Sequence, residues 1–161
     1  MTKMMLLLVV WLLTASFPAL AQVERVVVEA EGISVACTPG LEIALKSLDS
    51  IYKYAISVEK QMVSVTYFSG ERFEPKKLRW AVDKGEAEVV RFHVSGVGKV
   101  QQEGEQQFFV SGEDRFLIVN SSKLPADVSI GVVGVVDDST DPMQMKPDDF
   151  KVLTEPTPPK D

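Results

Sequence analysis

Apolar and polar positions in the first half of the chain switch repeatedly between strand and helix periodicity. Residues 26–33, 51–58, 62–68 and 87–94 show the every-second-residue alternation that is typical of strands. Between them, residues 39–48 and 75–84 carry apolar side chains at helical spacing, three or four positions apart. The pattern predicts the order β-α-β-β-α-β, the ferredoxin-like plan, in which two helices cover one face of a four-stranded antiparallel sheet.

The residues at the helix ends support this interpretation. Pro39 suits the first position of a helix that Thr38 can cap, and Gly85 is a candidate left-handed residue after the second helix. In the ferredoxin-like plan, three connections meet at one end of the sheet. We therefore expect Cys37, the turn at residues 59–61 and the connection at residues 84–86 to lie close together.

The second half of the chain has a different pattern of apolar and polar residues. Helical periodicity disappears near residue 92, and short apolar runs follow at residues 108–110, 116–119, 128–136 and 150–153. Turn residues separate these runs, which is typical of a compact β-barrel and resembles the OB type. Residues 89–100 could form one long strand or two strands bent at residues 96–98. The glycines there favour the bend.

The whole chain is therefore predicted to be an α+β protein in four parts. These are a signal peptide at 1–21, a ferredoxin-like domain at 22–91, a small OB-like domain at 92–154 and a disordered tail at 155–161. Lys3 precedes an apolar run, and Ala-Leu-Ala at 19–21 fits a cleavage site before Gln22. The run is short for a membrane span. We expect a periplasmic or otherwise extracytoplasmic protein, not stably inserted in a membrane after cleavage, with an uncleaved anchor as the alternative.

Charge and composition narrow the functional classes. The net charge is −6 and no cluster of Lys or Arg offsets it, so we expect no nucleic-acid partner. A single cysteine cannot form an intramolecular disulfide, although the predicted compartment permits disulfides. With one histidine and no nucleophile–base constellation or phosphate-binding glycine loop, the protein is predicted not to be an enzyme.

Cys37 lies where the first strand gives way to the first helix. Unpaired N–H groups and the positive end of the dipole at a helix N-terminus favour a thiolate, which is the form of cysteine that binds soft metals or attacks disulfides. The sequence around this position therefore indicates a site, but it supplies only one of the ligands that such a site normally has.

Several segments of the first half match one family pattern. Residues 41–45 read Leu-Glu-Ile-Ala-Leu, residues 63–67 read Val-Ser-Val-Thr-Tyr, and residues 78–82 read Leu-Arg-Trp-Ala-Val. On these segments, residues 25–90 resemble the heavy-metal-associated domain, the small module of copper chaperones, mercury-binding periplasmic proteins and metal-pumping ATPases. The resemblance implies a ferredoxin-like fold with a soft metal ion on a Cys-x-x-Cys loop. Here residues 34–37 read Ser-Val-Ala-Cys, so Cys37 falls on the second metal cysteine and Ser34 on the first.

The resemblance implies a degenerate metal site. Cys37 and Ser34 are its candidate ligands, Lys84 has a supporting role, and Cu(I), Hg(II) or Zn(II) are the candidate ions. Because a hydroxyl is a hard ligand, the site would bind a soft ion weakly or together with a protein partner that completes it. A second copy could do this in a metal- or disulfide-bridged homodimer. The alternatives are an interaction or structural module that kept the fold without the metal and, third, a thiol-redox enzyme, which the missing second cysteine disfavours.

Three other features are candidates for binding. His93 alternates with apolar residues on a strand, which favours a solvent-facing or hydrogen-bonded side chain over a metal ligand. Met143 and Met145 could together bind Cu(I) through their thioethers, although packing is the better interpretation. Residues 137–141 are acidic but lack the spacing of a calcium loop, and we interpret them as a solvated turn.

Overall fold

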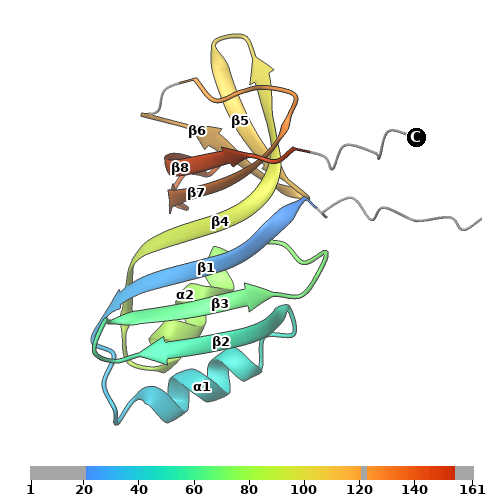
Figure 1. The fold of residues 1–161 in the computed structure, drawn as a ribbon. Helices are drawn as coiled ribbons and strands as arrows, with labels where there is room; N and C mark the ends of the chain where they lie inside the picture. Colours follow the sequence, from blue (N-terminus) through green and yellow to red (C-terminus); the bar gives the residue numbers. More distant parts are fainter. Residues whose placement is uncertain (1–20, 121–122, 155–161) are drawn as a thin grey trace, which may run out of the picture.

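The structure is a computed structural model that describes residues 21–120 and 123–154. It confirms the predicted α+β class. All eight strands belong to one sheet, which was not predicted, and there are two helices in the described residues (Figure 1). In chain order the elements are β1 (Gln22–Glu31), α1 (Thr38–Lys46), β2 (Ile51–Ser57), β3 (Met62–Tyr67), α2 (Pro75–Lys84), β4 (Glu88–Glu103), β5 (Gln106–Ser111), β6 (Asp114–Ile118), β7 (Ser129–Asp137) and β8 (Gln144–Val152). Residues 1–20 and 155–161, which hold nearly all of the predicted signal and the whole predicted tail, lie outside the described residues.

The first four strands are neighbours in the order β2-β3-β1-β4, and every pairing among them is antiparallel. Figure 1 shows α1 and α2 side by side on one face of these strands. The predicted stripe on the first helix is confirmed for Leu41, Ala44 and Leu45, which are buried while Lys46 is exposed. Leu48, its last predicted member, lies beyond the end of the helix and is partly buried. No helix within residues 21–120 and 123–154 is long and apolar enough to cross a membrane.

Strand β2 lies at the free edge of the sheet and departs from the predicted regular alternation. Ile51 pairs with Tyr67, whereas Lys53 pairs with Thr66, so Tyr52 is an extra residue in a bulge. Regular alternation over residues 51–58 would put Tyr52 and Tyr54 on one face. The bulge changes this, because Ile51 and Tyr54 both pack against the core, so the prediction was wrong at Tyr52. Tyr52 is exposed and packs edge-on against the ring of Phe68, with the two ring centres 5.2 Å apart.

Strand β4 is one continuous strand of sixteen residues that serves both halves of the molecule (Figure 1). It pairs with β1 on one side, with β7 from Phe92 to Lys99, and with β5 from Lys99 to Glu103. The predicted bend into two strands was wrong. The glycines allow close approach of backbones instead, since a Cβ at Gly96 would lie 2.8 Å from the Gln22 carbonyl oxygen and one at Gly98 only 2.1 Å from that of Val110. The predicted domain boundary at residues 91 and 92 falls inside β4.

The remaining strands follow the order β4-β5-β6-β8-β7, and β7 returns to pair with β4, which closes the circuit of pairings. The β6–β8 pairing is parallel, and the others in this circuit are antiparallel. The sequence indicated a last strand only at residues 150–153, but β8 already begins at Gln144. Its first part was missed because Lys146, Pro147 and two aspartates interrupt the apolar alternation, and the strand is irregular there.

The two halves share one hydrophobic core. Where they meet, the ring of Phe73 lies 5.4 Å from that of Phe92 and 6.3 Å from that of Phe116, between centres, and all three residues are buried. We call this region, together with the polar contacts of Arg79 and Asp114 beside it, the junction. The segment that leads from β3 into α2 is held at the junction by residues of the second half.

Candidate functional site

Three connections meet at one end of strands β1 to β4, as the sequence predicted. The side chain of Gln61, in the β2–β3 turn, accepts a hydrogen bond from the backbone N–H of Ile33 at 3.0 Å and donates one to its carbonyl oxygen at 2.8 Å. Glu86, in the connection from α2 to β4, contacts Cys37 in the loop from β1 to α1. We call this region the Cys37 end. It contains residues 32–37, 58–61 and 85–87.

Ser34 and Cys37 are held close together by a backbone turn. The backbone N–H of Cys37 donates to the Ser34 carbonyl oxygen at 3.2 Å and lies 3.3 Å from the Ser34 hydroxyl oxygen. The helix begins at Thr38, and Cys37 itself occupies the cap position. The prediction that Thr38 caps the helix was wrong, because its hydroxyl donates backward to the Ser34 carbonyl oxygen at 2.9 Å.

The thiol of Cys37 is half-buried and has a carboxylate as its partner. Its Sγ lies 3.3 Å from Oε2 of Glu86, at a distance and angle that suit a thiol donating to a carboxylate. A soft metal ion bound here would have both the sulfur and the carboxylate oxygen within reach.

Glu86 reaches Cys37 from an unusual backbone conformation. Its φ is 57°, and the N–H groups of Glu86 and Ala87 bond back to the carbonyl oxygens of Asp83 and Val82. This is the Schellman ending of a helix, with Glu86 at the left-handed position that usually holds glycine. The prediction that Gly85 is the left-handed residue was wrong. A Cβ at Gly85 would lie 2.8 Å from the Cβ of Leu41, so the glycine allows α1 and α2 to pack closely.

The other predicted ligand positions contribute little to the site. The Ser34 hydroxyl is directed at the backbone N–H of Cys37, and the Lys84 ammonium lies 5.9 Å from the ring centre of Trp80. Within residues 21–120 and 123–154, no three His, Cys, Asp or Glu side chains are grouped closely enough to hold a metal ion. The described part of the chain therefore offers one thiol, and a two-coordinate site built from thiolates needs a second one from elsewhere.

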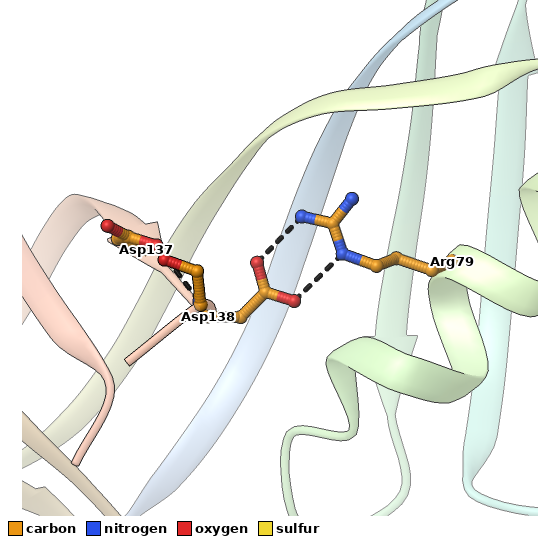
Figure 2. Close-up of polar contacts among 4 residues, drawn as sticks. Arg79, Asp137 and Asp138 are labelled. Carbon is orange, nitrogen blue, oxygen red and sulfur yellow. Dashed lines mark hydrogen bonds and ion pairs between the residues drawn. The ribbon is translucent and has the colours of Figure 1, made fainter. Parts of the chain in front are cut away.

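A second set of polar contacts lies at the junction. Arg79 of α2 donates two hydrogen bonds to the Asp138 carboxylate, at 2.8 and 2.7 Å, as Figure 2 shows. These bonds lower the pKa of Asp138 and raise that of Arg79. The interpretation of residues 137–141 as a solvated turn was wrong for Asp138. The Arg79–Asp138 pair could not be predicted from the sequence, because the two residues are far apart in the chain and only the topology brings the β7–β8 connection beside α2.

The remaining candidates are structural. His93 Nε2 lies 3.3 Å from Oε2 of Glu29 on the neighbouring strand, which agrees with the expected hydrogen-bonded side chain. Met145 is fully buried and Met143 packs against the core, in agreement with the packing interpretation.

No protein-family model matches the sequence, and no curated protein matches it either.

Proposed function

We propose that the first half of the molecule is a ferredoxin-like module of the heavy-metal-associated type and that the second half is an OB-type barrel. The strand order β2-β3-β1-β4 with two helices on one face supports the first assignment. The parallel β6–β8 pairing and the β4–β7 pairing that closes the circuit support the second. In this proposal, the shared strand β4 joins the two modules without a linker.

On this fold, the protein handles a soft metal ion with an incomplete site that a partner completes. The observation that carries this proposal is the geometry at the Cys37 end. A turn holds position 34 next to position 37 at the start of α1, where the family has two thiolates. Cys37 supplies one soft ligand. A thiolate from another molecule, either a partner protein or a second copy of this chain, supplies the other.

The same proposal places the protein outside the cytoplasm, with the mature chain starting at Gln22. Its support is the sequence of the signal and the position of Gln22, which is the first residue of the first described strand. Cleavage there would leave β1 intact. N-terminal sequencing of the exported protein tests this step, and recovery of residues 1–21 on the mature chain would contradict it.

The metal proposal is tested by anaerobic Cu(I) titration against a competing chelator, followed by native mass spectrometry. Wild-type protein should bind about one Cu(I) per two chains, as a bridged dimer, and Cys37→Ser should lose this binding. Ser34→Cys should bind one Cu(I) per chain and more tightly than wild type, because the turn already brings position 34 beside Cys37.

A matched control separates the geometry of the loop from the mere addition of a thiol. Ser47 is exposed at the opposite end of α1, so Ser47→Cys adds a second cysteine far along the helix from Cys37. This variant should not gain the one-to-one site. If Ser34→Cys binds no better than Cys37→Ser, the loop is not a metal site.

One observation favours a second candidate function, a protein-interaction module without a metal. The Cys37 thiol already has the Glu86 carboxylate as a partner, while the side chains of Val35 and Ile43 are 78% and 71% exposed nearby in sequence. Exposed apolar side chains in the loop and helix around Cys37 suit contact with a protein partner. Equal and negligible Cu(I) binding by wild type, Ser34→Cys and Cys37→Ser would favour this function.

A further inference from the structure

The junction contains a buried carboxyl group whose environment does not compensate a negative charge. Asp114, the first residue of β6, is only 1% exposed. Its Oδ2 accepts a hydrogen bond from the backbone N–H of Phe73 at 2.8 Å, but its Oδ1 has no hydrogen-bond partner among the described residues. A buried carboxylate normally needs several donors or a close cation, so this one is poorly solvated by the protein.

The charged and titratable groups around Asp114 do not supply the missing donor. Arg72 places its Nε 4.0 Å from Oδ1, beyond hydrogen-bond distance, and is itself largely exposed. Glu74, before α2, and Glu113, in the turn before β6, both add negative charge. Tyr67, at the end of β3, has a buried hydroxyl that also lacks a hydrogen-bond partner among the described residues. Burial raises the pKa of Tyr67 well above its ordinary value, so this hydroxyl stays neutral.

Asp114 connects two segments that are far apart in the sequence. It follows the turn between β5 and β6, and its partner Phe73 belongs to the segment that leads from β3 into α2. The ring of Phe73 packs between those of Phe92 and Phe116, so its position is also fixed by the aromatic core. The protonation state of the Asp114 carboxyl therefore affects the stability of the contact between the second half and the start of α2.

We infer that Asp114 is a proton-sensitive latch between the β5–β6 turn and the segment from β3 to α2. The neutral carboxyl fits the buried site and keeps the Phe73 N–H bond. The ionised carboxyl lacks enough hydrogen-bond donors in the same site. Ionisation therefore weakens the attachment of the segment from β3 to α2 to the second half. Burial raises the pKa of Asp114 to about 6, the Phe73 N–H and Arg72 oppose this rise, and Glu113 and Glu74 add to it. This inference does not depend on the proposed metal function.

The sign of the effect follows from linkage. The folded protein binds the Asp114 proton more tightly than the unfolded chain, whose carboxyl titrates near 3.8. The contribution of this group to stability is therefore largest in acid and is lost as the pH rises from about 4 through about 6. A difference of two pKa units corresponds to about a 100-fold change in the ratio of folded to unfolded protein.

The test compares urea unfolding of wild type and Asp114→Asn between pH 4 and pH 8. Asparagine keeps an acceptor for the Phe73 N–H and carries no charge. The variant should have a folded-to-unfolded ratio at least about 10-fold above wild type at pH 7.5, and this margin should close toward pH 4. Glu105→Gln, which changes an exposed carboxylate in the turn between β4 and β5, should show no such margin. A margin that stays the same at both pH values, or a less stable Asp114→Asn protein at pH 7.5, would overturn the latch.

Two measurements on wild-type protein keep the inference testable if the variant does not fold. The carboxyl carbon of Asp114, followed by NMR, should titrate with a midpoint near 6, as burial predicts. A midpoint below about 4.5 would contradict the inference, because a carboxyl that titrates near its ordinary pKa is not destabilised by burial. The exchange protection of the Phe73 amide, relative to that of Val28 in the sheet, should also fall as the pH rises from 5 to 7.5. An equal fall in the exchange protection of both amides would show that the segment at Phe73 does not open locally, and would contradict the inference.

Discussion

At the Cys37 end, the side chains of Gln61 and Glu86 connect the loops through hydrogen bonds, and the thiol remains partly accessible. At the junction, buried aromatic rings surround the segment that enters α2, and carboxylates provide the polar contacts. The first region depends on polar contacts near solvent, and the second depends on packing and on carboxylates that are largely buried. The difference predicts that substitutions at the junction cost more stability than substitutions at the Cys37 end.

The two carboxylates at the junction also respond to pH in opposite directions. Hydrogen bonds from Arg79 lower the pKa of Asp138, so its contribution to stability is present above the unfolded pKa and is lost as the pH falls through the folded pKa. Burial raises the pKa of Asp114, whose contribution is lost as the pH rises. The contribution of these two carboxylates to stability is therefore expected to be greatest at an intermediate pH, between the folded-state titrations of Asp138 and Asp114.

The largest effect should come from emptying the aromatic core of the junction. Phe73→Ala removes a ring that is 2% exposed and packs against two other rings, so we expect the free energy of unfolding to fall by about 3–5 kcal/mol. Urea unfolding measures the change. A loss below about 1 kcal/mol would mean that the junction does not carry the stability assigned to it.

A smaller loss is expected from Gln61→Ala at the Cys37 end. The side chain of Gln61 makes hydrogen bonds to the backbone of Ile33 and Val58, and its removal leaves partly buried backbone groups unpaired. We expect a loss of about 1–3 kcal/mol in the same assay. Lys60→Ala, in the same turn and exposed, is the matched control and should lie within about 0.5 kcal/mol of wild type. Equal losses for both variants would contradict the role of Gln61.

Asp138→Asn should cost about 1 kcal/mol at pH 7, because Arg79 is partly exposed and water replaces part of the lost interaction. The cost should shrink as the pH falls below 4, where the unfolded and then the folded wild-type carboxyl take up a proton. A double-mutant cycle with Arg79→Ala isolates the pair. A coupling energy near zero at pH 7 would show that the contact in Figure 2 does not stabilise the junction.

The smallest effect is expected at Val35, in the loop that carries the thiol. Its side chain is 78% exposed, so Val35→Ser should change the free energy of unfolding by less than about 0.5 kcal/mol. A larger loss would mean that the loop is packed more tightly than its exposure indicates, and the contrast between the two regions would weaken.

Local periodicity was sufficient to predict most of the first half. The buried stripe of Leu41, Ala44 and Leu45 follows from helical spacing, and the start of α2 at Pro75 follows from the conformational preference of proline. The meeting of three loops at the Cys37 end also followed, since the order of elements dictates it. These features depend on residues that are close in the sequence or on topology that a simple pattern fixes.

The missed features depend on contacts between distant residues. The glycines at 96 and 98 look like a bend when read locally, but they accommodate Gln22 and Val110 from other strands. Glu86 occupies a position that local rules give to glycine, and only its contact with Cys37 provides a reason for a longer side chain there. Likewise, nothing near Asp114 in the sequence indicates that its carboxyl is buried against Phe73.

Strand β4 has a consequence for how the chain acquires its structure. β1 lies near the start of the described residues, and its partner β4 lies beyond both helices, so their pairing has high contact order and is expected to form slowly. Until β4 has been synthesised and has paired with β1, one side of β1 is an open edge that can pair with other chains. A fragment that ended at residue 91 would keep this edge permanently, because most of β4 would be absent. We therefore expect the chain to fold as one cooperative unit, with the first half completed only after residues of the second half have been synthesised.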